Sequence, residues 1–170
     1  MNIRPNNYER MFPQNALLVT KTDLKGRITY ANQAFMDIVG MDEDTLVGAA
    51  HNVIRHPDMP RVIFKLLWSK LKNSKEVHAY VKNLCIDGSF YWVMANVTPS
   101  YDNSGAGDSK VIGYHSSRRQ PSKEALSIIQ PLYEELLRAE KSGGISASEK
   151  IINNLLHEKG VSYDEFILSI

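Results

Sequence analysis

The stretch EVHAYVKNLCIDGSFYWVMANVTPSYD, residues 76–102, decides the fold of this chain. Two runs in it alternate apolar and polar side chains with the two-residue period that is typical of strands. Asp87-Gly88 separates the runs, and an Asp-Gly pair in that position predicts a β-hairpin. The chain therefore contains an antiparallel sheet, and the remaining segments must supply what covers it.

Further runs with strand character lie on both sides of this hairpin. ALLVTKTD at residues 16–23 and RITYAN at residues 27–32 flank a Lys-Gly turn and predict a second hairpin. KVIGYHSSR at residues 110–118 follows a polar loop at 102–109 and predicts the last strand. Together these runs predict a five-stranded antiparallel sheet.

Helical patterns lie between the two hairpins and favour an α+β domain with its helices on one face of the sheet. Residues 33–40 place their apolar side chains on one helical side, and Asn32 precedes them in the position of a cap. Residues 41–48 predict a second short helix, with Asp42 as its cap. RVIFKLLWSKLKNS at residues 61–74 is a strong amphipathic pattern and predicts the long helix of the domain.

The pattern changes at Pro121, after which the chain reads as helices. Residues 122–144 predict a helix that is kinked or interrupted near Pro131, and residues 145–160 and 161–170 predict two more. We therefore expect an N-terminal cap segment, a central α+β domain and a C-terminal helical extension. These regions span residues 1–15, 16–120 and 121–170.

The composition excludes several classes of protein. Of the 170 residues, 43% are hydrophobic and 23% are charged, which is ordinary for a globular domain. The formal net charge of +1 gives no electrostatic reason to expect nucleic-acid binding. No apolar run is long enough to cross a bilayer, and the single cysteine forms no intrachain disulfide. We expect a cytoplasmic protein with no membrane span.

The polar decapeptide HNVIRHPDMP, residues 51–60, suits a dinucleotide ligand. Arg55 can contact phosphate oxygens with two parallel hydrogen bonds, and His56 can bond phosphate or ribityl hydroxyls. The N-terminus of the helix that follows Pro60 adds free N–H groups and partial positive charge. Asp58 is better suited to orienting its neighbours or capping the helix than to meeting a phosphate. The simpler interpretation is a capped helix entry with a surface ion pair.

At this point the sequence resembles a known family. TDLKGRITYANQAF at residues 22–35, the decapeptide with its helix, and VKN with DGSFYWVMANVTP at residues 81–99 occur in the order found in PAS domains. Within that family the chain resembles the aerotaxis-receptor type, which binds FAD as a redox sensor. The matching stretches lie between Ala16 and Arg119, and the resemblance implies a PAS fold with FAD held between the sheet and its helices.

The resemblance also implies which residues bind the cofactor or support signalling. They are Asn32, Arg55, His56, Asp58, Phe64, Trp68 and Asn83. Each has a second interpretation from its position alone: a helix cap for the asparagine at the helix start, core packing for the aromatic residues. One departure is Val77, where the family usually has a tryptophan, and its loss removes an aromatic contact to the cofactor.

Other chemistries have weaker support in the sequence. A haem-binding gas sensor would use His56, or next His78, as its axial ligand. The histidines lack the spacing of a metal site. Cys85 is expected on a strand, away from the helix that carries the reactive cysteine of light-sensing relatives, so a flavin–cysteine adduct is rejected. No catalytic triad or phosphate-binding glycine loop is present, so we expect no enzyme; a flavin reductase is the remaining enzymatic alternative.

The sequence thus predicts an FAD-binding PAS redox sensor for aerotaxis-like signal transduction, with a cofactor-free interaction module as a further alternative. A change in the charge of the flavin ring would alter its hydrogen bonds to side chains such as Asn83 and would shift the packing of the sheet against its helices. The expected partner is a second copy of the chain or a chemotaxis or other signalling protein. The Met1 start and the helical tail favour a free-standing sensor.

Overall fold

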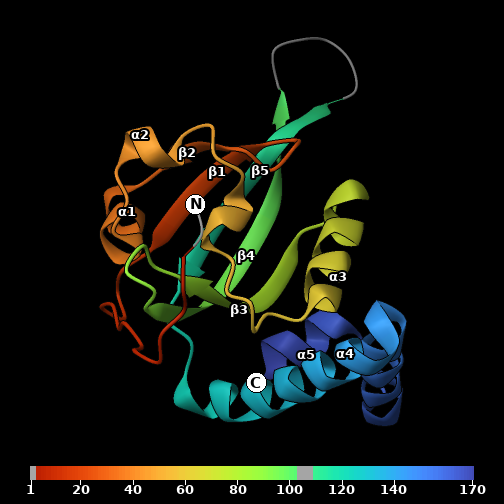
Figure 1. Ribbon diagram of the computed structural model, residues 1–170. Coiled ribbons are helices and arrows are strands. Elements are labelled where there is room, and N and C mark those ends of the chain that lie inside the picture. The colour runs from red at the N-terminus through yellow and green to blue at the C-terminus, as the bar shows by residue number, and fades with distance from the viewer. Residues whose placement is uncertain (1–2, 103–108) are drawn as a thin grey trace.

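A five-stranded antiparallel sheet forms the centre of the computed structural model, which describes residues 3–102 and 109–170 (Figure 1). The strand order across the sheet is β2-β1-β5-β4-β3. The predicted sheet is confirmed, and most of the loop expected at 102–109 lies outside the described residues. The strands are β1 (Leu18–Asp23), β2 (Ile28–Ala31), β3 (Val77–Leu84), β4 (Phe90–Asp102) and β5 (Lys110–Arg119).

The hairpin predicted at Asp87-Gly88 joins β3 to β4, whose register runs unbroken from Val77 opposite Val97 to Leu84 opposite Phe90. Gly88 has a φ of 86°, and a Cβ there would lie 2.2 Å from a backbone oxygen of the N-terminal segment, so only glycine fits. Cys85 was expected on a strand but lies one residue beyond β3, where its N–H donates to Ser89 O at 2.8 Å. It is fully buried.

Helices cover one face of the sheet, as the sequence predicted. They are α1 (Gln33–Val39), α2 (Glu43–Leu46), the 3₁₀ turn η1 (His51–Ile54) and α3 (Arg61–Lys72). Asn32 and Asp42 are confirmed as caps, because their side chains accept from the N–H groups of Phe35 and Thr45. Gly40 ends α1 with a left-handed φ of 70°.

The C-terminal extension consists of α4 (Lys123–Lys159) and α5 (Tyr163–Ser169). The boundary predicted between residues 144 and 145 is confirmed by a break in the helical backbone angles at Gly144, with φ 67° and ψ −168°, whereas the interruption predicted near Pro131 is wrong. Glycine reaches a positive φ without the penalty that a Cβ imposes, which makes this position the easier place to turn. Pro131 lies within the helix.

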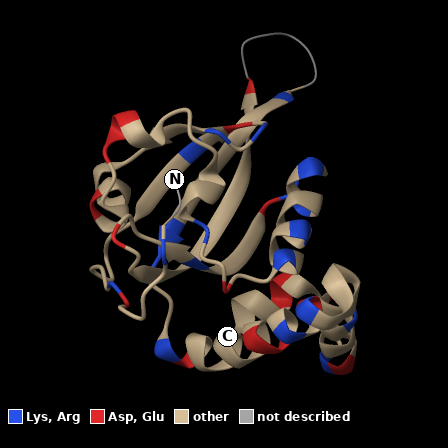
Figure 2. Cartoon of the chain, viewed as in Figure 1, with Lys and Arg blue, Asp and Glu red and all other residues tan. Residues whose placement is uncertain are grey.

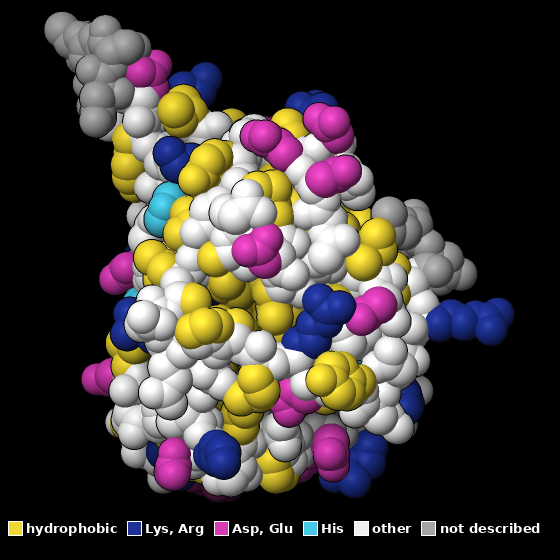
Figure 3. All heavy atoms as spheres, turned by 90° about the vertical axis from the view of Figure 1, so that its left-hand side faces the viewer, with side chains coloured by type: hydrophobic (Ala, Val, Ile, Leu, Met, Phe, Trp, Pro, Cys, Tyr) yellow, Lys and Arg dark blue, Asp and Glu magenta, His cyan; other side chains and the backbone are white. Residues whose placement is uncertain are grey.

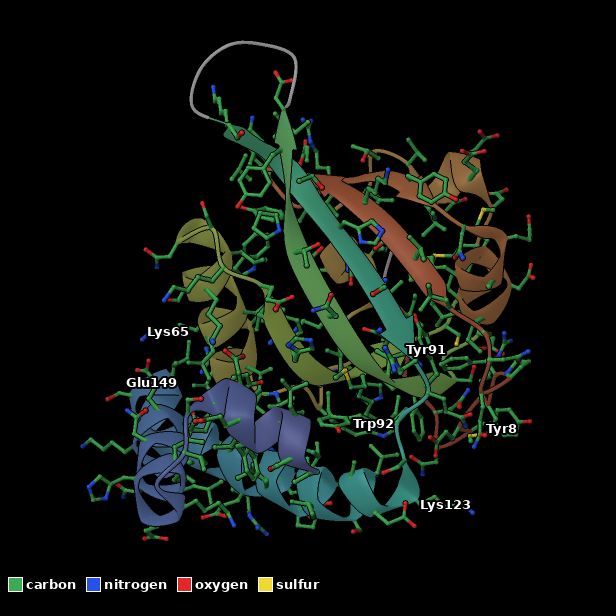
Figure 4. All side chains as sticks on the ribbon, turned by 180° about the vertical axis from the view of Figure 1, so that it is seen from behind. Tyr8, Lys65, Tyr91, Trp92, Lys123 and Glu149 are labelled. Carbon is green, nitrogen blue, oxygen red and sulfur yellow. The ribbon has the colours of Figure 1, made fainter. Side chains whose placement is uncertain are left out.

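The extension packs back onto the far face and edge of the sheet at β3 and β4 (Figures 1 and 4). The Tyr133 ring of α4 lies 6.0 Å from the Trp92 ring of β4. Tyr133 Oη also donates to the Tyr80 carbonyl at 2.7 Å, and Tyr80 Oη donates to the carbonyl of Ile170 at 3.1 Å. The apolar faces of the tail are therefore covered by the domain itself, in part through strand β3.

The N-terminal segment runs along the β3–β4 hairpin. Arg10 N–H donates to Phe90 O at 2.7 Å, and Phe90 N–H donates to Tyr8 O at 3.0 Å. The guanidinium of Arg10 pairs with Asp87 at 2.6 Å, and Phe12 meets the ring of Tyr91 edge-on at 6.3 Å. On this side of the molecule, apolar side chains appear in small groups among polar and charged ones (Figure 3). No helix in the described ranges is both long and apolar enough to cross a membrane.

Candidate functional site

A cavity of about 300 Å³ lies between the inner face of the sheet and the helices that cover it. Helix α3 supplies an aromatic and aliphatic wall, and η1 closes one end. Strands β1, β3, β4 and β5 supply the floor, with mixed polar and apolar side chains. The volume is at the lower end of the range for ligand pockets, about 300–1,000 Å³.

Four of the residues implied by the family resemblance line this cavity: Arg55, Phe64, Trp68 and Asn83. The Arg55 guanidinium lies 4.0 Å from the centre of the Phe64 ring, in cation–π contact, and donates to the Met59 carbonyl at 3.2 Å. The Arg55 backbone also bridges to Asn83 on β3, so the decapeptide and the strand form one wall. Trp68 meets Tyr114 of β5 edge-on at 5.6 Å.

Asn32 does not line the cavity. Besides capping α1, its Oδ1 accepts from the Val19 N–H at 3.0 Å, and its Nδ2 donates to the Leu17 carbonyl at 2.8 Å. These bonds connect the start of α1 to β1, so the polar atoms of the Asn32 side chain have structural hydrogen bonds.

His56 lines a second and more open groove of about 1,000 Å³, separated from the cavity by Asn52 and Arg55, which line both. His56 is 3% exposed, and its Nδ1 accepts from the Asp58 N–H at 3.1 Å. Burial, together with the charge of Lys82, lowers the pKa of His56 to about 4, so the ring is neutral at neutral pH. Its Nε2 has no partner among the described residues.

Asp58 is the most exposed of the predicted residues, with 60% of its side chain accessible. Its carboxylate pairs with Lys82 at 2.8 Å and lies 3.5 Å from His56 Nδ1. Burial pushes the pKa of Asp58 up, but the hydrogen bond and charge of Lys82 outweigh it and leave the pKa below its ordinary value. The main partner of Asp58 is thus Lys82, which the sequence did not suggest; of the expected neighbours it lies near His56 and does not cap α3.

The sequence interpretation missed a buried polar cluster that β1, η1 and β5 bring together. Arg118 donates to Thr20 Oγ1 at 2.9 Å and to His51 Nε2 at 2.7 Å. Because a guanidinium only donates, His51 Nε2 is an acceptor and the ring is neutral. Burial, reinforced by the charge of Arg118, lowers the pKa of His51 to about 3. The alternation of β5 was the available signal, since Tyr114, Ser116 and Arg118 share one face.

Polar atoms without partners are concentrated around the cavity. Among the described residues, Asn83 Nδ2, Ser116 Oγ and Arg118 Nη1 are buried without a hydrogen-bond partner, and all three residues line the cavity. Burial raises the pKa of Tyr91, opposite Asn83 in the sheet; its hydroxyl is close enough to the Asn83 side chain for an interaction that offsets part of this rise, but it makes no hydrogen bond of good geometry. Most buried polar groups in proteins are hydrogen-bonded, so this concentration points to a ligand with polar groups of its own.

The N-terminus of α3, expected to offer free N–H groups to a phosphate, is instead capped by Glu140 of α4. The N–H groups of Arg61 and Val62 donate to the carboxylate at 3.0 and 2.9 Å, and Ser148 Oγ donates at 3.1 Å. Burial raises the pKa of Glu140, but these bonds outweigh it and hold the pKa below its ordinary value. The expectation of free donors at this helix end is therefore wrong in this structure.

Two further ion pairs join α3 to the extension, Lys65 with Glu149 at 2.6 Å and Lys70 with Asp164. Figure 2 shows the basic residues along α3, and Figure 4 shows Lys65 and Glu149 side by side. The helix that walls the cavity is thus fastened to the C-terminal extension at several points.

The histidines suggested as haem ligands do not line the cavity. His56 faces the groove, and His78 lies on the opposite face of β3, bonded to Asn96 at 2.8 Å. Val77, the departure from the family pattern, is buried on the same face of β3 as the lining residues. Within the described ranges no group of three or more His, Cys, Asp or Glu side chains could hold a metal ion.

Comparison with known proteins identifies the family. The sequence profile described as PAS fold matches residues 28–115, more than half of the chain. The chain belongs to the PAS family. It is 37% identical over 119 residues to the aerotaxis receptor of Escherichia coli, a match that covers 70% of this chain and 22% of the receptor. A nitrogen fixation regulatory protein of Klebsiella pneumoniae is 27% identical over 59% of this chain and 20% of its own.

Solved structures agree with this PAS assignment at the level of the fold. The crystal structure of a PAS domain from Colwellia psychrerythraea has a TM-score of 0.55 at 20% identity, covering 63% of this chain and 87% of that one. The light-state LOV domain of the blue-light photoreceptor Aureochrome1 has a TM-score of 0.56 at 19% identity, covering 69% and 90%. The chain is thus a PAS domain of the aerotaxis-receptor type with a helical extension, and it spans about a fifth of the curated relatives it matches.

Proposed function

We propose that this PAS domain is a redox sensor that holds FAD non-covalently between its sheet and helices and transmits the flavin's redox state to a partner protein. Its similarity to a protein named as an aerotaxis receptor supports the proposal. The observation that carries it is the set of buried, unpartnered polar atoms of Asn83 and Ser116 beside the aromatic wall of Phe64 and Trp68. A flat ring with polar edges matches that combination.

The lining residues fit the two parts of FAD in two adjacent spaces, the ring system in one and the phosphate and adenine groups in the other. The cavity of about 300 Å³ suits a planar ring system and is too small for a whole dinucleotide. The wider groove beyond Arg55 offers room for the phosphate and adenine groups. Arg55 lies between the two spaces and carries the charge that a pyrophosphate needs. His56, with its unpartnered Nε2, supplies a hydrogen-bond donor among the residues that line the groove.

A bound flavin would supply reversible electron transfer with a change in the charge and protonation of its ring. The chain's part is to detect that change and pass it on. Asn83 presents its amide to the cavity from β3, three residues from Tyr80, whose carbonyl and hydroxyl both bond to the extension. Movement of β3 would therefore reach α4 and the C-terminus through hydrogen bonds that are already in place.

The partner is expected at the C-terminal extension or the N-terminal segment. Both rest on the β3–β4 hairpin, which forms one side of the cavity. A second copy of the chain or a chemotaxis or other signalling protein would bind there and respond to the packing of these segments.

The test is the absorption spectrum of the purified protein, with and without added FAD, followed by acid release of the chromophore. We expect a flavin spectrum and release of FAD. Arg55→Ala should lose most of the flavin, with exposed Arg27→Ala as the matched control. Asp58→Ala should lose less, because its carboxylate is largely exposed and acts through Lys82 and His56; Asp37→Ala on α1 is its control.

Two outcomes would contradict the proposal. Colourless protein whose melting temperature does not change with FAD would indicate a cofactor-free module, since specific binding raises stability by linkage. A Soret band would indicate haem. Wild-type flavin occupancy in both the Arg55 and Asp58 variants would remove the role assigned to the decapeptide.

A further inference from the structure

Glu140 belongs both to the C-terminal extension and to the open groove of about 1,000 Å³. It lies on α4 and lines the groove together with the basic side chains of Arg55, Arg61 and Lys141. Among the described residues that line the groove, Glu140 is the one acidic side chain. The charge of the groove therefore favours an anion, and the chain supplies one of its own.

Both carboxylate oxygens of Glu140 bind the start of α3. Oε2 accepts from the N–H and from Nε of Arg61 at 3.0 and 3.2 Å, and Oε1 accepts from the N–H of Val62 at 2.9 Å. Backbone N–H groups at a helix N-terminus and a guanidinium are also the donors that bind phosphate in proteins. Glu140 thus holds the donors that a phosphate in this groove would use.

The same carboxylate also fixes the bend of α4. Glu140 Oε1 accepts from the Ser148 hydroxyl at 3.1 Å, and the helical backbone angles break at Gly144, between these two residues. The two halves of α4 run in different directions on either side of this break (Figure 1). Among the described residues, no atom lies within 4 Å of the position that a Cβ would take at Gly144. The bend is therefore held by contacts such as that of Glu140 with Ser148, and not by packing at the glycine itself.

His56 provides a second indication of an anionic ligand in the groove. It is 3% exposed, and its Nδ1 accepts from the Asp58 N–H, so the neutral ring carries its proton on Nε2. This Nε2 has no hydrogen-bond partner among the described residues. A buried donor without an acceptor is costly, and a phosphate oxygen in the groove would supply the acceptor.

We propose that Glu140 is an internal competitor of the groove ligand: a phosphate that binds at the start of α3 replaces the Glu140 carboxylate, which then releases Ser148 and loosens the bend of α4. This inference rests on the proposed function in taking the ligand to carry phosphate groups. By linkage the converse also holds, because the contacts that fix the bend weaken the binding of a phosphate. The second half of α4 therefore responds to the groove, separately from any response to the ring in the cavity.

The first test compares FAD with riboflavin, which has the ring and no phosphate, in the wild type and in Glu140→Gln. We expect Glu140→Gln to bind FAD about tenfold more tightly, because the neutral amide competes less well for the donors and does not repel phosphate. Its affinity for riboflavin should not change. Glu149→Gln is the matched control, since Glu149 lies on the same helix, outside the groove, and should change neither affinity. An unchanged ratio of the FAD and riboflavin affinities in Glu140→Gln would overturn the proposal.

The second test needs neither a flavin nor a variant. Hydrogen exchange of the wild type is measured with ADP and with adenosine, which lacks phosphate. ADP should speed exchange of the amides of residues 145–152 about tenfold and leave residues 125–137 unchanged, whereas adenosine should change neither segment. If the protein binds no flavin but shows this pattern, the flavin function fails and the competition stands. Unchanged exchange at residues 145–152 with ADP, whether or not flavin binds, would overturn the competition.

Discussion

Two buried charged side chains, Glu140 and Arg118, are treated in opposite ways by this fold. Glu140, 8% exposed, receives two backbone N–H groups, the Ser148 hydroxyl and the Arg61 guanidinium. Arg118, 5% exposed, has two uncharged partners, and its Nη1 has none in the described chain. The first group is balanced within the chain and the second is not.

We attribute the difference to two tasks: Glu140 holds two helices together, and Arg118 lines the cavity that we propose binds a ligand. Glu140 connects the extension to the start of α3. Because this contact has to be stable in the isolated protein, all of its hydrogen bonds are made within the chain. Arg118 faces the cavity together with the unpartnered atoms of Asn83 and Ser116. Unpartnered groups that gather at one cavity are explained by a ligand that supplies the missing partners.

The largest expected effect on stability comes from removing the Glu140 carboxylate. Glu140→Ala should lower the free energy of unfolding by about 3 kcal/mol, because it leaves the first N–H groups of α3 and the Ser148 hydroxyl without their charged acceptor. Urea denaturation measures the change. Glu149→Ala is the control, since its ion pair with Lys65 is partly exposed and should contribute less than about 1 kcal/mol. Equal losses in the two variants would contradict the role given to Glu140.

The pH dependence of the free energy of unfolding tests the other half of the comparison, the contact between Arg118 and His51. The folded pKa of His51, about 3, lies below its ordinary value of 6.5, so the unfolded chain binds the proton first as the pH falls. Between about pH 8 and pH 5 this histidine should remove about 2 kcal/mol from the free energy of unfolding. His51→Gln, which keeps an acceptor for Arg118, should lose that part of the pH dependence. An unchanged slope would mean that His51 is not held neutral by its site.

A smaller effect is expected where the extension meets β3. Tyr133→Phe removes the buried hydrogen bond to the Tyr80 carbonyl and should cost about 1 kcal/mol. Tyr101→Phe is the matched control, because Tyr101 is partly exposed and its bond to Ser74 is long, at 3.4 Å. Thermal unfolding at neutral pH separates the two variants. A larger loss in Tyr101→Phe would show that the docking of α4 does not depend on this bond.

The smallest effect on stability belongs to Asp58. Its side chain is 60% exposed, and Asp58→Asn keeps a hydrogen-bond acceptor for Lys82, which is 15% exposed, so the free energy of unfolding should change by about 0.5 kcal/mol or less. A flavin loss in Asp58→Asn without a stability loss would assign the carboxylate to ligand binding. A stability loss above about 1 kcal/mol would instead give the Asp58 carboxylate a structural role, like that of Glu140.

Local patterns predicted most of the fold. The hairpin at Asp87-Gly88 and the caps at Asn32 and Asp42 depend on residues that are neighbours in the sequence, so their physical cause is visible there. The helix boundary predicted at residues 144 and 145 also followed from the sequence, because a glycine reaches the positive φ found at Gly144 without a steric penalty. The interruption predicted near Pro131 did not occur, because a proline removes one helix hydrogen bond but whether the helix breaks there depends on packing that the sequence does not show.

The candidate site was less accessible to sequence reasoning. Arg55 and Asn83 were singled out, and they do line the cavity. Thr20, His51 and Arg118 were not, because they come from three distant segments and meet only when β1 pairs with β5. Arg118 also reads as one of a pair of arginines at a strand end, where exposure is the usual outcome.

The most direct test of the central claim is the identity of what fills the cavity in protein purified from cells. If the cavity is a flavin site, the wild type is yellow, its absorption shows the flavin bands in the blue, and acid releases FAD in an amount close to one per chain. Arg55→Ala, purified in parallel, retains much less. Wild-type protein that is colourless, and that neither binds added FAD nor gains stability from it, would contradict the claim.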